Sequence, residues 1–381
     1  MREDFGLEPV EYPATRKTGA TPEERAADIH AAFADPTVKA VMASIGGDDM
    51  ITVLPCLDRE LIRANPKPFF GMSDNTNLLM FLYNTGIVGF HGATVMAALG
   101  RPGAMAPLTE ESLRAALFTP GEYELRPAER WRDVDRDWAD PATFEVEPET
   151  RPGTGWQWVN ADRVVEGRSW GGCLEIVAWL LMADREISHD LSVYDGGVLL
   201  LETSEEMPSG TEVFRTLRNM GERGLLQRFP ALLVGRPKTW SFERPHSPEE
   251  SDRYAAEQHE AILRAMRTYA PRHDDRVRCG LRPHRSAARP ALRRHDPRRR
   301  PRPAHHRHLL TGATARSPRS ASAPHRAHRR GCSRRRAERG GTVPWGVGAY
   351  LTAVALFSFG CFTLLPKTRP VVVPVREPFL E

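Results

Sequence analysis

The chain has 381 residues, of which 40% are hydrophobic, and this is enough for two or three domains with real cores. The net charge of +4 averages two unlike parts, because the chain is balanced to acidic up to about Pro271 and strongly basic after it. The five cysteines are odd in number and contain no Cys-x-x-Cys pair. They argue against a disulfide framework or a zinc site and favour a reducing, cytoplasmic compartment. The N-terminus lacks the apolar region of a signal peptide.

The first strong pattern is a capping box at Thr21-Pro22-Glu23-Glu24, which predicts an alanine-rich helix through Phe33. The apolar run Ala40–Ile45 follows and predicts a buried strand that ends in Gly46-Gly47-Asp48-Asp49. The two glycines could bring a backbone amide close to a ligand, or they could simply form a tight connection. Both interpretations stay open at this point.

A serine stands between a strand pattern and a helix pattern in the stretch Pro68–Leu79. The aromatic run before Gly71 indicates a buried strand, and Asn75–Tyr83 has helical periodicity. At such a turn the Ser73 hydroxyl would stand clear of the sheet while the first helical amides point into the same space, where an oxyanion could be held. A serine that only caps the helix is the alternative. The alternation of helices and strands predicts a parallel sheet with its site at the carboxyl ends of the strands.

Residues 107–155 are rich in proline, tryptophan and acidic side chains, and we interpret them as an interdomain connection. Three tryptophans, Trp156, Trp158 and Trp170, are expected to be packing residues and not ligand-stacking ones.

A second apolar block begins at Gly171 and is expected to run as a helix to Met182. The next run, Gly197–Glu202, predicts a strand that ends on a carboxylate. Because a buried carboxylate is costly unless it is paired, Glu202 should have a histidine or arginine partner, unless it lies at a surface strand end. Four further elements are predicted: a helix over Val213–Met220, a strand over Ala231–Gly235, a helix from Ser247 through Met266, and the start of a strand at Val277–Leu281.

The composition changes after Leu281. Over residues 282–341 arginine occupies about a third of the positions, while Lys, Phe, Tyr, Trp, Ile, Val and Met are absent, so we expect this segment to be disordered. It would attract polyanions without recognising a specific nucleic acid. The uncharged apolar run 345–365 is long enough to cross a bilayer, although a chance hydrophobic stretch would look the same.

Five motifs in order resemble the LD-carboxypeptidase family of serine peptidases, and most of all its branch with the microcin C immunity protein. They are Ser44–Asp49, Pro68–Asp74, Val88–Gly92, Trp170–Glu175 and Leu200–Glu205. The resemblance covers roughly Phe5–Leu281. It implies an α/β fold with a Rossmann-like parallel-sheet domain and a smaller C-terminal α/β domain.

The family uses a Ser-Glu-His triad, so the resemblance implies that Ser73 is the nucleophile and that Glu202 orients the histidine. The amides of Gly47 and Asp74 would form the oxyanion hole. Family members cleave the amide before a terminal D-alanine in murein peptides, and the immunity branch cleaves an acyl-nucleotide amide. No metal or organic cofactor is implied, and a homodimer is expected by analogy.

The sequence departs from the family pattern at both ends. The family's first βα unit does not precede Met1. After Leu281 the family continues into Gly-His-Thr-Asp-Pro-Gln, whose histidine is the catalytic base, whereas this chain has Arg282-Pro283-His284-Arg285. The family then continues to a Leu-Pro-Tyr-Gly-Gly turn. One set of codons for Gly-His-Thr-Asp-Pro-Gln-Pro-Ala-Leu-Pro-Tyr-Gly-Gly, read one base earlier, encodes this chain's sequence from Arg282 to His295, so we hypothesise a frameshift near Leu281. The catalytic histidine is then unknown, and His284 is not the family's histidine.

These considerations predict the following organisation: an N-terminal peptidase domain over residues 1–125, a linker over 126–160, a truncated C-terminal peptidase domain over 161–281, the arginine-rich segment 282–341, and an apolar tail over 342–381. We expect a serine carboxypeptidase or amidase with weak activity. A non-catalytic binding remnant or unstable product with a basic, membrane-associated tail is the alternative.

Overall fold

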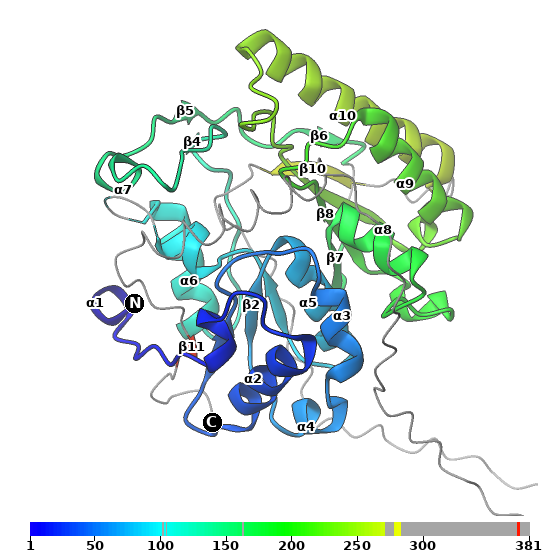
Figure 1. Cartoon of the computed structure of the whole chain (residues 1–381). Helices are drawn as coiled ribbons and strands as arrows, with labels where there is room; N and C mark the ends of the chain where they lie inside the picture. Colours follow the sequence, from blue (N-terminus) through cyan, green and yellow to red (C-terminus); the bar gives the residue numbers. More distant parts are fainter. Residues whose placement is uncertain (101–102, 104, 162–163, 271–277, 283–371, 374–381) are drawn as a thin grey trace, which may run out of the picture. The chain divides into compact units, whose positions relative to one another are not determined.

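Parallel strands alternate with helices along the chain, which confirms the predicted α/β class (Figure 1). The computed structural model describes residues 1–270 except 101, 102, 104, 162 and 163, together with the strands at 278–282 and 372–373. All of them belong to a single unit formed by Met1–Arg294 and Phe359–Glu381. The predicted arginine-rich segment beyond Arg282 and the apolar run 345–365 lie outside the described residues.

The first sheet has four strands in the order β11-β1-β2-β3. Strands β1 to β3 are parallel, whereas β11 pairs with β1 in the antiparallel direction. The strands are β1 (Ala40–Met42), β2 (Phe69–Gly71), β3 (Gly89–His91) and β11 (Val372–Val373). Since β1 to β3 run the same way, their carboxyl ends meet at one edge of the sheet.

Six helices belong to this part of the chain: α1 (Arg2–Phe5), α2 (Pro22–Ala34), α3 (Met50–Val53), α4 (Arg59–Ala64), α5 (Thr76–Thr85) and α6 (Pro107–Phe118). The predicted capping box of α2 is present, since Thr21 and Glu24 exchange hydrogen bonds between side chain and backbone. A 3₁₀ turn, Ser73–Asn75, leads into α5, which ends at Gly86 in the left-handed conformation that glycine favours.

The second sheet has five strands in the order β6-β10-β9-β8-β7, and only β6 is antiparallel to its neighbour. The strands are β6 (Trp158–Val159), β7 (Ser169–Cys173), β8 (Val198–Glu202), β9 (Ala231–Gly235) and β10 (Arg278–Arg282). The helices between them are α8 (Leu174–Met182), α9 (Gly210–Glu222) and α10 (Pro248–Tyr269). The predicted strands and helices of this region are therefore present.

The apolar block at Gly171 differs from its prediction, because its first residues form a strand and α8 begins only at Leu174. Both glycines have a positive φ, +128° at Gly171 and +153° at Gly172. A Cβ at Gly171 would lie 1.9 Å from the Leu200 carbonyl oxygen of the neighbouring strand. The glycines thus allow two strands to approach closely. Glycine also has a low helix propensity, which favours a strand over a helix at these two positions.

The segment predicted as a linker has structure of its own. It contains a two-stranded ribbon of β4 (Arg130–Trp131) and β5 (Arg151–Pro152) and the short helix α7 (Ala142–Glu145). Its Asp135 carboxylate lies 2.8 Å from Nζ of Lys238, a side chain that is only 1% exposed. Residues 158–159, also within the predicted linker, pair with β10. The domain boundaries themselves stay a prediction.

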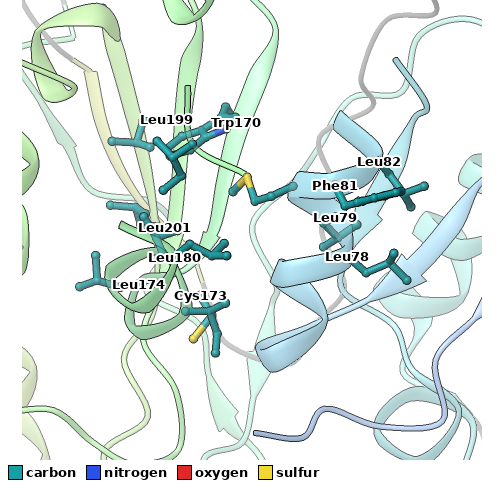
Figure 2. Packing of buried hydrophobic residues seen from close by; sticks show 14 of the residues in the cluster. Leu78, Leu79, Phe81, Leu82, Trp170, Cys173, Leu174, Leu180, Leu199 and Leu201 are labelled. Carbon is teal, nitrogen blue, oxygen red and sulfur yellow. The ribbon is translucent and has the colours of Figure 1, made fainter. Parts of the chain in front are cut away.

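One hydrophobic cluster contains residues from helices that come after strands of both sheets (Figure 2). Helix α5 contributes Leu78 and Leu82, and α8 contributes Leu174 and Leu180. Trp170 is 3% exposed and stacks on Phe229 with ring centroids 5.5 Å apart. This packing fixes α5, and therefore the turn before it, against the second sheet. No helix in the described part of the chain is long and apolar enough to span a membrane.

Candidate active site

Ser73 lies at a strained turn between β2 and α5. Its φ is +55°, in the left-handed region that serine rarely adopts. Strand β2 ends two residues earlier at Gly71, and the 3₁₀ turn that starts at Ser73 leads directly into the helix. The side chain is half-buried. A serine held in this conformation between a parallel strand and a helix has the geometry of a nucleophile elbow.

Two glycines make room for this elbow. A Cβ at Gly71 would lie 2.6 Å from Cβ of Asn75, so only glycine lets the chain fold back here. A Cβ at Gly46 would lie 2.9 Å from Cβ and 3.1 Å from Oγ of Ser73. The turn that follows β1 therefore runs directly against the serine side chain.

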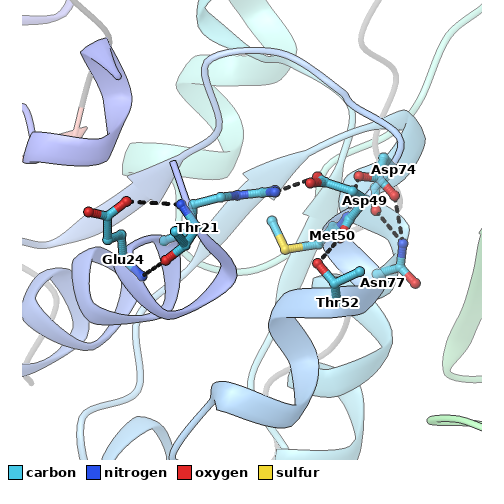
Figure 3. A network of polar contacts seen from close by, with 8 residues as sticks. Thr21, Glu24, Asp49, Met50, Thr52, Asp74 and Asn77 are labelled. Atoms are coloured by element: carbon cyan, nitrogen blue, oxygen red, sulfur yellow. Dashed lines mark hydrogen bonds and ion pairs between the residues drawn. The ribbon is translucent and has the colours of Figure 1, made fainter. Parts of the chain in front are cut away.

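Asp74 connects the elbow to that same turn (Figure 3). Its carboxylate is 2% exposed. Oδ2 accepts a 2.8 Å hydrogen bond from the Met50 backbone N–H, and Oδ1 accepts a 2.7 Å bond from Nδ2 of Asn77. Burial raises the pKa of Asp74, although the hydrogen bond from Met50 opposes the shift. The outer side of the turn is held by an ion pair between Asp49 and Arg25.

The structure thus brings together three of the predicted site residues, Ser73, Asp74 and Gly47. A Cβ at Gly47 would lie 3.2 Å from Oδ2 of Asp74. Asn75 adds a second connection, because its Nδ2 donates to the Ile45 carbonyl oxygen at 2.8 Å. The predicted oxyanion amides therefore belong to two segments that are in contact.

Glu202 is the last residue of β8, and the sequence predicts a histidine or arginine partner for it. Nε2 of His91 lies 3.4 Å from Oε1 of Glu202, and the two side chains are 21% and 18% exposed. His91 ends β3, where it is paired in register with Gly71 of β2. The contact joins the carboxyl end of a strand of the first sheet to that of a strand of the second.

Three hydrogen bonds fix the surroundings of Glu202. The Glu175 carboxylate, in the first turn of α8, accepts from the backbone N–H of Ser204 at 3.0 Å and from its Oγ at 2.7 Å. The Cys173 N–H donates to Oγ1 of Thr76 at 3.1 Å, which ties β7 to the first turn of α5. Burial together with Glu175 and Glu202 raises the pKa of Cys173 far above its ordinary value, so this thiol stays protonated.

Sequence reasoning did not identify His91 or Thr76 as part of the site. A histidine at the end of a strand pattern, followed by Gly92, was the available signal for His91. His284 lies outside the described residues. Within the described part of the chain, no group of three or more His, Cys, Asp or Glu side chains could hold a metal ion.

Two profiles of a single family match the chain. The LD-carboxypeptidase N-terminal domain matches residues 1–92, and the LD-carboxypeptidase C-terminal domain matches residues 166–275. The chain is 28% identical over 242 residues to an inferred carboxypeptidase of Vibrio cholerae, a match that covers 61% of this chain and 68% of the relative. It is 33% identical over 140 residues to the microcin C7 self-immunity protein MccF of Escherichia coli, covering 35% of this chain and 41% of MccF.

Solved structures agree with this relationship. An MccF-like protein from Streptococcus pneumoniae, crystallised with AMP, superposes with a TM-score of 0.63 at 25% identity, covering 74% of this chain and 82% of that one. MccF in complex with aspartyl sulfamoyl adenosine gives a TM-score of 0.56 at 22% identity, covering 74% and 79%, and supports the fold alone. Both halves of the described fold thus have the same relatives, and the chain belongs to the LD-carboxypeptidase family of serine peptidases.

Proposed function

We propose that this protein is a serine amide hydrolase of the LD-carboxypeptidase type, with Ser73 as nucleophile. The observation that carries the proposal is the positive φ of Ser73 at the carboxyl end of a parallel strand, with the turn after β1 packed against its side chain. Such strain persists only where the surrounding structure enforces it, and it occurs mostly at functional sites.

In this proposal the reaction follows the usual course of an activated serine. Oγ of Ser73 attacks the amide carbonyl carbon while a base takes its proton, and the carbonyl oxygen becomes an oxyanion. The amides of Gly47 and Asp74 donate hydrogen bonds to that oxyanion. The amine then leaves with the proton, and water hydrolyses the acyl-serine ester. Glu202 holds the imidazole that serves as base in the required tautomer.

The base is the weak point of this chain. The family's Gly-His-Thr-Asp motif is absent from the sequence, and the arginine-rich segment stands in its place. Because triad members act as a unit, loss of the base costs several powers of ten in rate. We therefore expect slow turnover, and we keep the frameshift near Leu281 as the explanation. Sequencing of the locus tests it, since an intact reading frame without neighbouring Gly-His-Thr-Asp codons would refute it.

Two substrate classes fit the family. One is a murein peptide with a terminal D-amino acid, and the other is an acyl-nucleotide amide. The first class is supported by 39% identity over 110 residues to a protein of Bacillus subtilis that is named as a murein peptide carboxypeptidase. The second class is supported by similarity to MccF and to an MccF-like protein crystallised with AMP. A homodimer and a cytoplasmic location stay predictions.

The test is mass spectrometry of the protein after incubation with diisopropyl fluorophosphate, with Ser73→Ala as control. We expect one adduct on Ser73 and none in the variant. A folded protein without an adduct would mean that no group in this chain activates Ser73, and it would favour the non-catalytic alternative. Parallel incubation with a murein tetrapeptide and with aspartyl sulfamoyl adenosine, followed by mass spectrometry of the products, then separates the two substrate classes.

A further inference from the structure

The Asp74 carboxylate joins two segments that lie 24 residues apart in sequence. It follows the elbow serine directly, yet its Oδ2 accepts the backbone N–H of Met50, at the start of α3. A carboxylate just before a helix commonly caps that helix by accepting hydrogen bonds from the backbone amides of the first helical turn. Here it receives an amide from another segment, and α5 has no side-chain hydrogen bond at its N-cap residue Asn75.

Holding a carboxylate at this position is costly. The side chain is 2% exposed, and its pKa is raised by burial, which means that the surroundings disfavour its charge. An apolar residue of similar size would avoid this cost. A role that needs hydrogen-bond acceptors at this point explains why the carboxylate is there.

That role follows from what Met50 is attached to. The residues just before it, from Gly46 to Asp49, form the turn that packs against Ser73, with 2.9 Å between a Cβ at Gly46 and Cβ of Ser73. A movement of Met50 would therefore move Gly47 relative to the serine. Displacements of an ångström are enough to lose the benefit of an oxyanion donor.

We infer that Asp74 is a positioning residue, whose side chain holds the Gly46–Met50 turn so that the Gly47 amide stays beside Ser73. This inference rests on the proposed function for its catalytic meaning. Asp74 contributes in two ways: its backbone amide is one predicted oxyanion donor, and its carboxylate fixes the segment that carries the other. The second way requires no contact between the carboxylate and the substrate.

The test compares Asp74→Ala and Asp74→Asn with Asp48→Asn, an exposed carboxylate of the same turn. Three quantities are measured: the rate of Ser73 modification by diisopropyl fluorophosphate, the ³¹P chemical shift of the adduct, and hydrogen exchange at the Gly47 and Met50 amides. For Asp74→Ala we expect modification about a hundredfold slower or more, a moved ³¹P signal and faster exchange at both amides. Asp74→Asn retains an acceptor for Met50 and should recover most of the rate, while Asp48→Asn should match the wild type.

The outcomes separate the two proposals. If the folded wild type is not modified at all, the proposed function fails, and hydrogen exchange still decides the positioning role. Unchanged exchange at Gly47 and Met50 in Asp74→Ala would overturn that role whether or not Ser73 reacts. Should Asp74→Ala fail to fold, the comparison of Asp74→Asn with Asp74→Glu replaces it, because a longer carboxylate displaces Met50 while keeping the charge. Wild-type rate, ³¹P shift and exchange in Asp74→Glu would also refute the inference.

Discussion

Nε2 of His91 lies 3.4 Å from Oε1 of Glu202, and the two residues end strands of different sheets. Both side chains are largely buried, so each is partly removed from water. A carboxylate in such a place is costly unless a polar or cationic group lies beside it. The His91 imidazole takes that place next to the carboxylate that we propose as a member of the triad, and the contact joins the two sheets at the site.

The first prediction concerns this pair. In a double-mutant cycle of His91→Ala and Glu202→Ala, we expect a coupling free energy of about 0.5–3 kcal/mol, measured by chemical denaturation, because the two groups share a half-buried contact. The exposed pair of Lys17 and Glu24 is the control and should give less than about 1 kcal/mol. Additivity of the two single changes would show that the contact contributes nothing to stability.

The backbone strain at Ser73 gives a second prediction. Ser73→Ala and Ser73→Gly both remove the hydroxyl, but only glycine adopts a φ of +55° without strain. We expect the glycine variant to be more stable than the alanine variant by about 0.5–1 kcal/mol, since the relief of strain exceeds the added entropy of the unfolded chain. Thermal and urea denaturation measure the difference. An alanine variant as stable as the glycine variant would mean that the turn is unstrained.

Local patterns in the sequence predicted the elements well. The capping box before α2, the strand–serine–helix order at Ser73 and the strand that ends on Glu202 all depend on neighbouring residues. Two stretches differ from their predictions. The apolar block before α8 begins with a strand, whose glycines allow the close approach of β8. Residues 107–155, interpreted as an interdomain connection, contain helix α6 and the β4–β5 ribbon.

The tertiary contacts of the site could not be predicted in the same way. His91 and Glu202 are 111 positions apart, and Met50 meets Asp74 across 24. No periodicity connects such pairs, because they arise from the packing of separate strands at one edge. The expectation that Glu202 has a histidine or arginine partner was correct in kind, since burial of charge requires it, but the sequence alone did not identify which residue.

A third prediction tests the contact between the predicted linker and the second sheet. Lys238 is 1% exposed, and its Nζ lies 2.8 Å from Asp135 and donates to the Asp133 carbonyl oxygen at 2.6 Å. Lys238→Met leaves buried carboxylate charge without this cation, so we expect a loss of about 3–5 kcal/mol in the free energy of unfolding. Arg267→Met removes one partner of an exposed pair with Glu260 and should cost less than about 1 kcal/mol. Equal effects of the two changes would mean that the linker contact adds no stability.

The last prediction concerns pH and Asp74. Burial raises the pKa of this carboxyl above its ordinary value of 3.8, so the folded state binds its proton more tightly than the unfolded state does. The resulting contribution to stability is fully present below the ordinary pKa and is lost as pH rises through the raised one. Asp74→Asn has no such proton. We therefore expect the free energy of unfolding of the wild type, relative to this variant, to fall as the pH rises from the ordinary pKa of the carboxyl through its raised pKa in the folded state.

Urea denaturation of both proteins at a series of pH values measures this difference, in which the other carboxyl groups cancel. A difference between wild type and Asp74→Asn that stays constant with pH would show that the Asp74 carboxyl titrates alike in both states. The buried acceptor for Met50 would then carry no electrostatic cost, and the argument that the carboxylate is retained for its positioning role would lose its energetic basis.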